Sequence, residues 1–179
     1  RHAAGKVSVV GVLLVDIDHF KSINDRFGHG VGDLVLQAVG LALKQGVRTG
    51  EMVVRWGGEE FLVIVEASDR LQVDAAARRL RALIAESCRT LQTTAGPALP
   101  PLSASIGCAC LPLAEERTAR WPDALEIADF CLYRAKRSGR NRCITLEVLQ
   151  ADAVEVNTMV SAQTLEHWLA SGTAALREV

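Results

Sequence analysis

The chain has 179 residues, of which 49% are hydrophobic and 23% are charged, and its formal net charge is −1. This length suits one domain with a single core, and the composition is that of an ordinary globular protein. A net charge so close to zero argues against a surface built for nucleic acid, so we expect no nucleic-acid partner.

The chain has no apolar run of the roughly 18 residues that a membrane-spanning helix needs. Its longest apolar run, Val7–Val15, has the length of a strand. No signal peptide is visible, and the sequence begins at Arg1 rather than at a methionine. We therefore expect a cytoplasmic piece of a longer protein. Any contact with a membrane would come through a missing N-terminal region. Five cysteines without a CxxC pair favour buried, reduced thiols: Cys88, Cys108, Cys110, Cys131 and Cys143.

The first predicted element is a strand over Val7–Asp16, which is rich in β-branched residues and apolar on both faces. A short polar segment, Phe20–Phe27, suggests one or two helical turns. Gly28–Gly32 is predicted to be a loop, and Asp33–Leu43 has the apolar spacing of a helix, which Gly46 would end.

A β-hairpin is predicted next, because Glu51–Trp56 and Phe61–Glu66 have strand patterns and two adjacent glycines separate them. Leu71–Cys88 has helical periodicity. Thr93–Pro101 contains three prolines and a glycine, which indicate a loop.

Leu102–Leu111 is the next predicted strand. A helix follows over Pro122–Arg137, with proline in the first turn, where its missing N–H costs nothing. A turn at Ser138–Asn141 leads to a final strand, Cys143–Val148. The order β-α-α-β-β-α-β-α-β predicts an α/β (α+β) fold, in which a mixed central sheet is flanked by helices. This domain covers residues 1–148, and residues 149–179 are predicted to form a helical tail.

The hairpin carries two glycines and two carboxylates in succession: Gly57, Gly58, Glu59 and Glu60. Adjacent glycines let the backbone approach a ligand closely. Taken alone, however, an ordinary hairpin with exposed carboxylates explains this pattern better than a binding site does.

Asp16 ends the first predicted strand, and Asp18 follows two positions later. A buried carboxylate is costly without a partner. A metal ion or a helix N-terminus would provide that partner, and hard cations such as Mg²⁺ prefer oxygen ligands. An Asp at a strand end that faces a hairpin Glu is a suitable arrangement for such a cation.

Two further pairs suit a nucleotide. Asn24 and Asp33 offer the donors and acceptors that pair with the edge of a purine, although both also suit turns and helix N-caps. Lys136 and Arg140 lie four residues apart around a predicted helix end and would grip a triphosphate. A solvated basic helix C-terminus explains this second pair equally well.

Together these stretches carry a long ordered pattern: Asp16-x-Asp18-x-Phe20-Lys21-x-x-Asn24-Asp25, Gly28-His29-x-x-Gly32-Asp33, Arg55-Trp56-Gly57-Gly58-Glu59-Glu60-Phe61, Ser105-Ile106-Gly107, Ala128-Asp129-x-x-Leu132-Tyr133-x-Ala135-Lys136 and Gly139-Arg140-Asn141. Over roughly Val7–Glu147 the chain resembles the GGDEF family of diguanylate cyclases. The resemblance implies the palm-like fold of nucleotidyl cyclases. It also implies an enzyme that condenses two GTP molecules into cyclic di-GMP and two pyrophosphates, in a homodimer whose domains face each other.

The resemblance also implies a role for each residue of the pattern. Two divalent metal ions, Mg²⁺ or Mn²⁺, are expected on Asp16, Glu59 and the carbonyl of Ile17, with Glu60 beside them as a further ligand or as the base. The residues expected to bind substrate are Asn24 and Asp33 at the guanine, Lys136 and Arg140 at the phosphates, and Phe20, Lys21, Gly57 and Gly58 around them. The alternative is a non-catalytic domain that binds GTP or cyclic di-GMP as a sensor.

The sequence departs from the family pattern in two places. The family's inhibitory product site is an Arg-x-x-Asp, and here Arg48 is followed by Glu51 at the acidic position. The longer side chain changes the reach of the acceptor, so we expect weak product binding there. The family's opening segment is also missing, so we expect the fragment to be less active than its parent.

Overall fold

The computed structural model describes residues 9–87, 89, 91, 99–113, 120–151, 154 and 159–179. Its centre is a six-stranded sheet with the order β2-β3-β1-β4-β5-β6. Neighbouring strands are antiparallel, except that β4 and β5 are parallel. In chain order, the elements are β1 (Val9–Ile17), α1 (Phe20–Phe27), α2 (His29–Gly46), β2 (Met52–Gly57), β3 (Glu60–Ala67), α3 (Arg70–Ser87), β4 (Ala104–Leu111), α4 (Trp121–Arg137), β5 (Cys143–Val148), α5 (Ala162–Ala170) and β6 (Ala174–Glu178).

The predicted mixed sheet flanked by helices is confirmed, and so is the order of its first nine elements. The loop predicted over Gly28–Gly32 is wrong, because α2 already begins at His29. Only Gly28 interrupts the helical backbone, with φ 83° and ψ 159°, and its N–H still bonds to the carbonyl of Asn24. Most of the loop predicted over Thr93–Pro101 lies outside the described residues.

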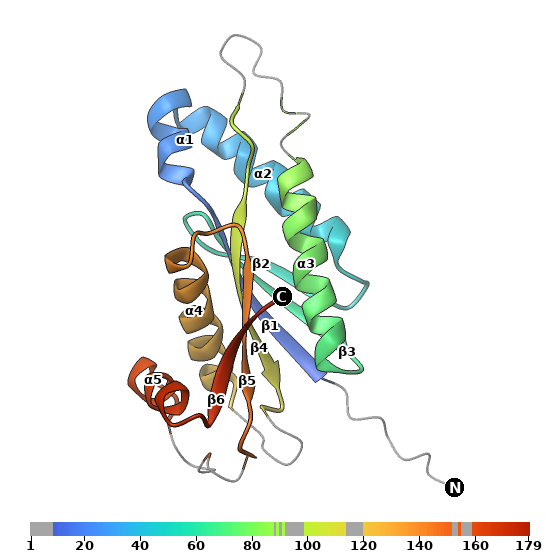
Figure 1. The fold of residues 1–179 in the computed structure, drawn as a ribbon. Helices are drawn as coiled ribbons and strands as arrows, with labels where there is room; N and C mark the ends of the chain where they lie inside the picture. Colours follow the sequence, from blue (N-terminus) through green and yellow to red (C-terminus); the bar gives the residue numbers. More distant parts are fainter. Residues whose placement is uncertain are drawn as a thin grey trace, which may run out of the picture.

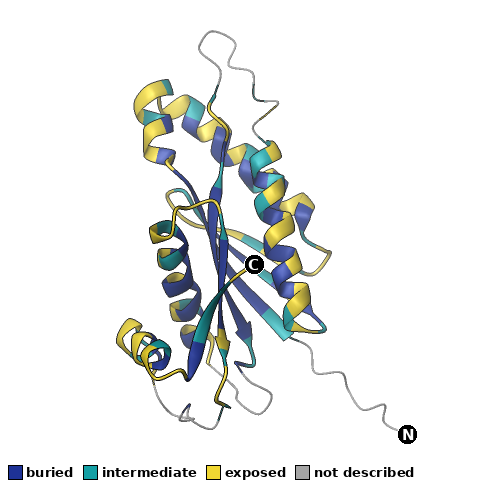
Figure 2. Ribbon diagram, viewed as in Figure 1, coloured by how far each residue is buried: buried dark blue, intermediate teal, exposed yellow. Residues whose placement is uncertain are grey.

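Helices cover both faces of the sheet, and two hydrophobic clusters fill the layers between them (Figure 1). Helices α2 and α3 pack on one face, and α4 packs on the other, with α5 beside it. Figure 2 shows that the central strands β1 and β4 are buried along most of their length, whereas the edge strand β2 is largely exposed. The apolar pattern of β1, which has no polar face, follows from its burial on both sides.

Helix α4 lies directly on β4, because Gly107 has no side chain to separate them. A Cβ at this position would come within 2.0 Å of the Ala128 carbonyl oxygen and 2.3 Å of the Leu132 nitrogen. No other residue type fits there unless the helix moves. The contact therefore fixes the height of α4 above the sheet and the position of the side chains in its last turn.

The segment that was predicted to be a helical tail contains α5 and also a strand, β6, which pairs with β5 and extends the sheet. Its side chains are tied to the domain. Arg177 of β6 forms an ion pair of 2.6 Å with Asp74 of α3, which is almost fully buried, and a longer contact of 3.4 Å with Glu147. Leu165 and Trp168 of α5 are buried in the same core as α4.

Four cysteines of the described residues are buried and form no disulfide: Cys108, Cys110, Cys131 and Cys143. Burial raises the pKa of Cys110 and of Cys143 to about 11, so these thiols are protonated and inert at neutral pH. Cys88 lies outside the described residues. Among the helices of the described part, none combines the length and apolar character that crossing a bilayer requires.

Candidate functional site

The turn between β2 and β3 exposes its glycines to open space. Gly58 adopts φ 42°, and a Cβ added to Gly57 or Gly58 would meet no atom within 4 Å. Arg55 stabilises the turn, since its Nε and Nη2 donate to the Gly58 carbonyl at 3.0 and 2.8 Å. The turn thus presents a bare backbone toward the end of β1.

The end of β1 lies directly beside this turn. Asp16 is opposite Glu60 in the antiparallel pairing of β1 and β3, and the Ile17 N–H bonds to the Glu59 carbonyl at 3.4 Å. On its other side, Asp16 pairs with Ser105 of β4. Three carboxyl-bearing residues from two separate stretches of the sequence, Asp16, Glu59 and Glu60, therefore gather at one edge of the sheet.

Asp16 is only 6% exposed, and its carboxylate contacts Lys136 from the last turn of α4, with Nζ to Oδ2 at 2.7 Å. Burial raises the pKa of Asp16, and the charges of Glu59 and Glu60 raise it further, whereas the hydrogen bond and charge of Lys136 lower it. The net direction is upward. Burial therefore makes the charged form of Asp16 costly, and the single lysine offsets only part of that cost.

Asp18 is as deeply buried as Asp16, but the structure gives it a different role. Its Oδ1 accepts from Ser105 Oγ at 2.7 Å, and its Oδ2 accepts from Ser103 Oγ at 2.7 Å and from the Asn141 N–H at 3.0 Å. These bonds tie the end of β1 to β4 and to the turn after α4. The sequence offered no signal for this role beyond the repeated Asp. Nor does either Asp cap α1, whose N-cap residue is His19.

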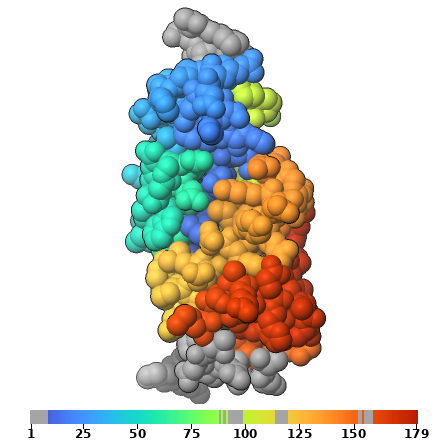
Figure 3. Space-filling model, turned by 90° about the vertical axis from the view of Figure 1, so that its left-hand side faces the viewer, coloured from blue at the N-terminus to red at the C-terminus, as the bar shows by residue number. Residues whose placement is uncertain are grey.

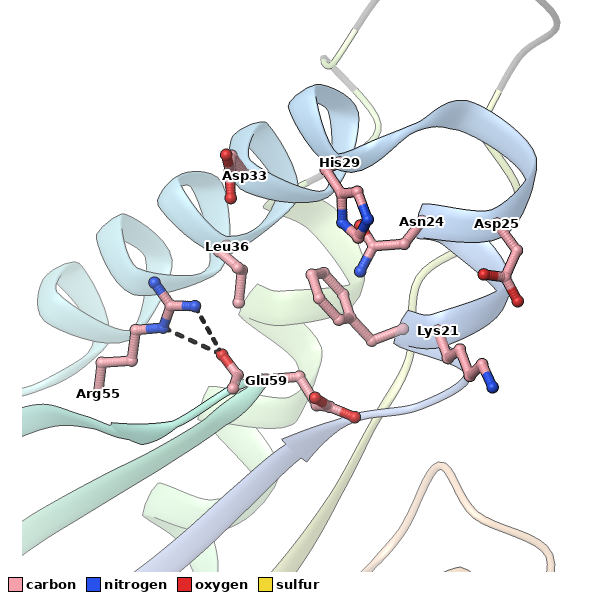
Figure 4. A pocket seen from close by; sticks show the side chains of 10 residues that line it. Lys21, Asn24, Asp25, His29, Asp33, Leu36, Arg55 and Glu59 are labelled. Carbon is pink, nitrogen blue, oxygen red and sulfur yellow. Dashed lines mark hydrogen bonds between the residues drawn. The ribbon is translucent and has the colours of Figure 1, made fainter.

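A pocket of about 500 Å³ opens beside the carboxylates. It is lined by ten residues: Phe20, Lys21, Asn24, Asp25, His29, Asp33, Leu36, Arg55, Gly58 and Glu59. Figure 4 shows Asn24, His29 and Asp33 along α1 and α2, across the pocket from Arg55 and Glu59 of the hairpin. On the molecular surface, the blue N-terminal helices, the green hairpin and the orange segment near residue 140 come together on one face (Figure 3).

Six of the predicted site residues line this pocket. The six are Phe20, Lys21, Asn24, Asp33, Gly58 and Glu59. The pocket residues that sequence reasoning gave no role are Asp25, His29, Leu36 and Arg55, although three of these stand in the quoted pattern. Arg140 lies in the exposed turn after α4 with φ 60°, and its N–H bonds to the Ala135 carbonyl at 3.0 Å.

Gly32 explains how Asn24 reaches its place in the pocket wall. A Cβ on Gly32 would lie 1.9 Å from Asn24 Oδ1 and 3.2 Å from the Phe20 ring. Helix α2 therefore needs a glycine where α1 packs against it. Any side chain there would push the amide of Asn24 out of its position, so the glycine has a packing role that supports the pocket.

The family model for "Diguanylate cyclase, GGDEF domain" matches residues 1–142, which include the hairpin, both aspartates, the pocket and Lys136. The chain belongs to the GGDEF family. Among curated relatives, it is 35% identical over 141 residues to the diguanylate cyclase DosC of Escherichia coli, covering 79% of this chain and 29% of that protein. It is 39% identical over 131 residues to the uncharacterized protein YhcK of Bacillus subtilis, covering 73% of this chain and 35% of YhcK. The chain thus spans about a third of the length of these relatives.

Solved GGDEF domains have the same fold. The GGDEF domain of DgcB from Caulobacter crescentus, in complex with cyclic di-GMP, has a TM-score of 0.69 at 29% identity, over 77% of this chain and 78% of that one. The active GGEEF domain of a diguanylate cyclase from Vibrio cholerae has a TM-score of 0.60 at 28% identity, over 76% and 82% of the two chains.

The turn that was expected to be a degenerate product site uses its acid internally in this GGDEF domain. The Glu51 carboxylate accepts from the Arg48 N–H at 2.6 Å and from the Glu66 N–H at 3.3 Å. The turn is closed further by a bond from the Glu51 N–H to the Arg48 carbonyl. Both oxygens of the carboxylate therefore serve the backbone.

The carboxylates of this GGDEF domain fit a divalent cation in charge and in donor type. Asp16 and Glu59 offer hard oxygen donors, and the three carboxyl-bearing residues Asp16, Glu59 and Glu60 stand against one lysine, Lys136. Within the described ranges, however, no group of three acidic, histidine or cysteine side chains is close enough to enclose a metal by itself. A cation held here would need further oxygens from a ligand. Phosphate and water usually provide these for Mg²⁺.

Proposed function

We propose that this GGDEF domain is a diguanylate cyclase, which condenses two GTP molecules into cyclic di-GMP and releases two pyrophosphates. One observation carries the proposal. Folding brings Asp16, the Gly57–Glu60 turn and Lys136 to a single edge of the sheet, beside a pocket of about 500 Å³. The pocket has the volume of a small-ligand site, and its acidic edge would suit a triphosphate that is accompanied by divalent cations.

The pocket is suited to the guanine base. Asn24 offers both a donor and an acceptor, and the carboxylate of Asp33 accepts from N–H groups, which guanine presents at N1 and N2. Adenine lacks this pair of donors. We therefore assign base recognition to Asn24 and Asp33, with Phe20 and Leu36 as the apolar part of the wall.

Asp16 and Glu59, with the carbonyl of Ile17, would hold two divalent cations, Mg²⁺ or Mn²⁺. Bound there, the cations would neutralise the triphosphate and activate the attacking 3′-hydroxyl. Glu60 lies opposite Asp16 in the sheet and would accept the proton of that hydroxyl or complete the acidic cluster. Lys136 and Arg140 would bind the phosphates, and the bare backbone of Gly57 and Gly58 leaves them room.

The reaction needs a second copy of the domain. One pocket holds one GTP, so two domains must face each other with their nucleotides antiparallel. Each 3′-oxygen then attacks the α-phosphorus of the other nucleotide, and each bond formed expels one pyrophosphate. The protein contributes mainly positioning and fixed charge, as in other phosphoryl transfers.

Incubation with GTP and Mg²⁺, followed by chromatography of the products, tests the proposal. We expect cyclic di-GMP, formed at a specific activity that rises with protein concentration because the active species is a dimer. ATP should be a poor substrate. Saturable GTP binding without any cyclic di-GMP over a wide range of protein concentrations would indicate instead a non-catalytic binding domain.

A further inference from the structure

Lys136 provides the positive charge that contacts the buried carboxylate of Asp16. Its Nζ is 2.7 Å from Asp16 Oδ2, and the lysine side chain is 34% exposed, whereas that of Asp16 is 8% exposed. The ammonium group thus reaches from the surface down to a buried carboxylate. Lys136 is thus the counter-ion of the buried Asp16 carboxylate.

Two of the neighbouring basic side chains are engaged elsewhere. Arg134 pairs with Glu166 of α5, and Arg142 pairs with Glu178 of β6 and donates to the Arg140 carbonyl. Lys136 differs from these two arginines because its partner, Asp16, belongs to the proposed catalytic site. A lysine is well suited to change partners, because its charge is compact and its four-carbon side chain is flexible.

A divalent cation and the Lys136 ammonium would compete for the same carboxylate. Two positive charges on one buried carboxylate repel each other strongly, because the surroundings screen them poorly. A cation on Asp16 therefore weakens the hold of the carboxylate on the lysine and favours its displacement. The arriving triphosphate would provide a new anionic partner for the lysine and the extra oxygen ligands that the cation lacks.

We propose that Lys136 couples metal binding to nucleotide binding: it blocks Asp16 against divalent cations in the nucleotide-free protein and moves to the triphosphate when GTP binds. This inference rests on the proposed function and adds to it a role for the lysine in the free protein. The consequence is that the site acquires metal and nucleotide together and binds metal poorly without nucleotide.

Titration with Mn²⁺ alone tests the proposal, with free Mn²⁺ followed by electron paramagnetic resonance. Lys136→Met should bind Mn²⁺ about tenfold more tightly than the wild type, because the competitor is gone. Lys136→Gln keeps a donor for Asp16 and should show the same gain, which protects the test if the Met variant does not fold. The matched control, Arg137→Met, removes an exposed charge from the next position and should change the affinity less than about twofold.

Equal Mn²⁺ affinity in the wild type and in both Lys136 variants would overturn the proposal, as would the absence of measurable binding to those variants. A second titration includes a GTP analogue that cannot be cleaved at the α-phosphorus. The analogue should raise the Mn²⁺ affinity of the wild type about tenfold more than that of Lys136→Met. If the wild type binds no Mn²⁺ even with the analogue, the proposed cyclase function itself fails, which separates the two outcomes.

Discussion

Two buried carboxylates stand two residues apart at the end of β1, and their surroundings differ completely. Asp18 accepts three hydrogen bonds from uncharged donors, two serine hydroxyls and one backbone N–H. Asp16 has a single flexible lysine as its partner and two glutamates nearby. The comparison shows that burial alone does not mark a functional acid. The functional candidate is the carboxylate that is held by one long, flexible side chain rather than by a set of short hydrogen bonds.

The largest expected effect is the loss of cyclase activity when Asp16 or its neighbour Glu59 loses its charge. Glu59→Gln and Asp16→Asn keep the size of the side chain but remove a charge that would hold metal. Each should lower cyclase activity about 1000-fold, or about 4 kcal/mol of transition-state stabilisation, with little change in fold. Chromatography of cyclic di-GMP, with circular dichroism as the control for folding, measures this. Turnover near that of the wild type in either variant would refute the metal assignment.

Asp18→Ala tests the other side of the comparison. The substitution leaves two hydroxyls and an N–H without their acceptor, so it should lower the free energy of unfolding by about 3 kcal/mol. Ser105→Ala removes one of the three bonds and should cost about 1 kcal/mol. Urea denaturation measures both values. A variant of Asp18 with unchanged stability but no activity would show that this residue, too, belongs to the catalytic site.

Glu51 extends the comparison to a third carboxylate, which is engaged by backbone N–H groups as Asp18 is engaged by its donors. Glu51→Ala should cost about 1 kcal/mol of stability, because the site is only half-buried. Arg48→Ala should change the affinity for cyclic di-GMP less than about threefold, since this turn offers the product no free acid. Calorimetric titration with cyclic di-GMP measures this affinity. A sharp fall in affinity in Arg48→Ala would show that the turn does act as an inhibitory product site.

The smallest effect concerns pH. The pKa of Asp16 is raised in the folded protein, mainly by burial, so its contribution to stability is complete below the unfolded value of about 3.9 and is lost as pH rises through the folded pKa. The Asn variant has no group that titrates here, so it does not lose stability in this way. As the pH rises from about 3.9 through the folded pKa of Asp16, with EDTA present, the free energy of unfolding of Asp16→Asn should therefore increase relative to that of the wild type. A constant difference would indicate that Lys136 compensates the charge fully.

The sequence by itself determined the order of the first nine elements, the family and most of the pocket. Apolar periodicity and the two glycines define the strands and the hairpin, because local pattern and turn chemistry decide these features. Local pattern did not reveal β6. Its strand pairing depends on β5, and its anchoring depends on Asp74 of α3, which is 103 residues away from Arg177.

The family pattern assigned the metal to Asp16 and gave Asp18 no role, and only the tertiary structure showed that Asp18 is structural. Asp16 and Asp18 have the same side chain and similar burial, so local residue chemistry alone does not separate them. Their partners come from β4, from the turn after α4 and from α4 itself, between 85 and 123 residues away. The charge state and availability of a buried carboxylate depend on the groups within a few ångströms of it, and folding alone brings those groups there.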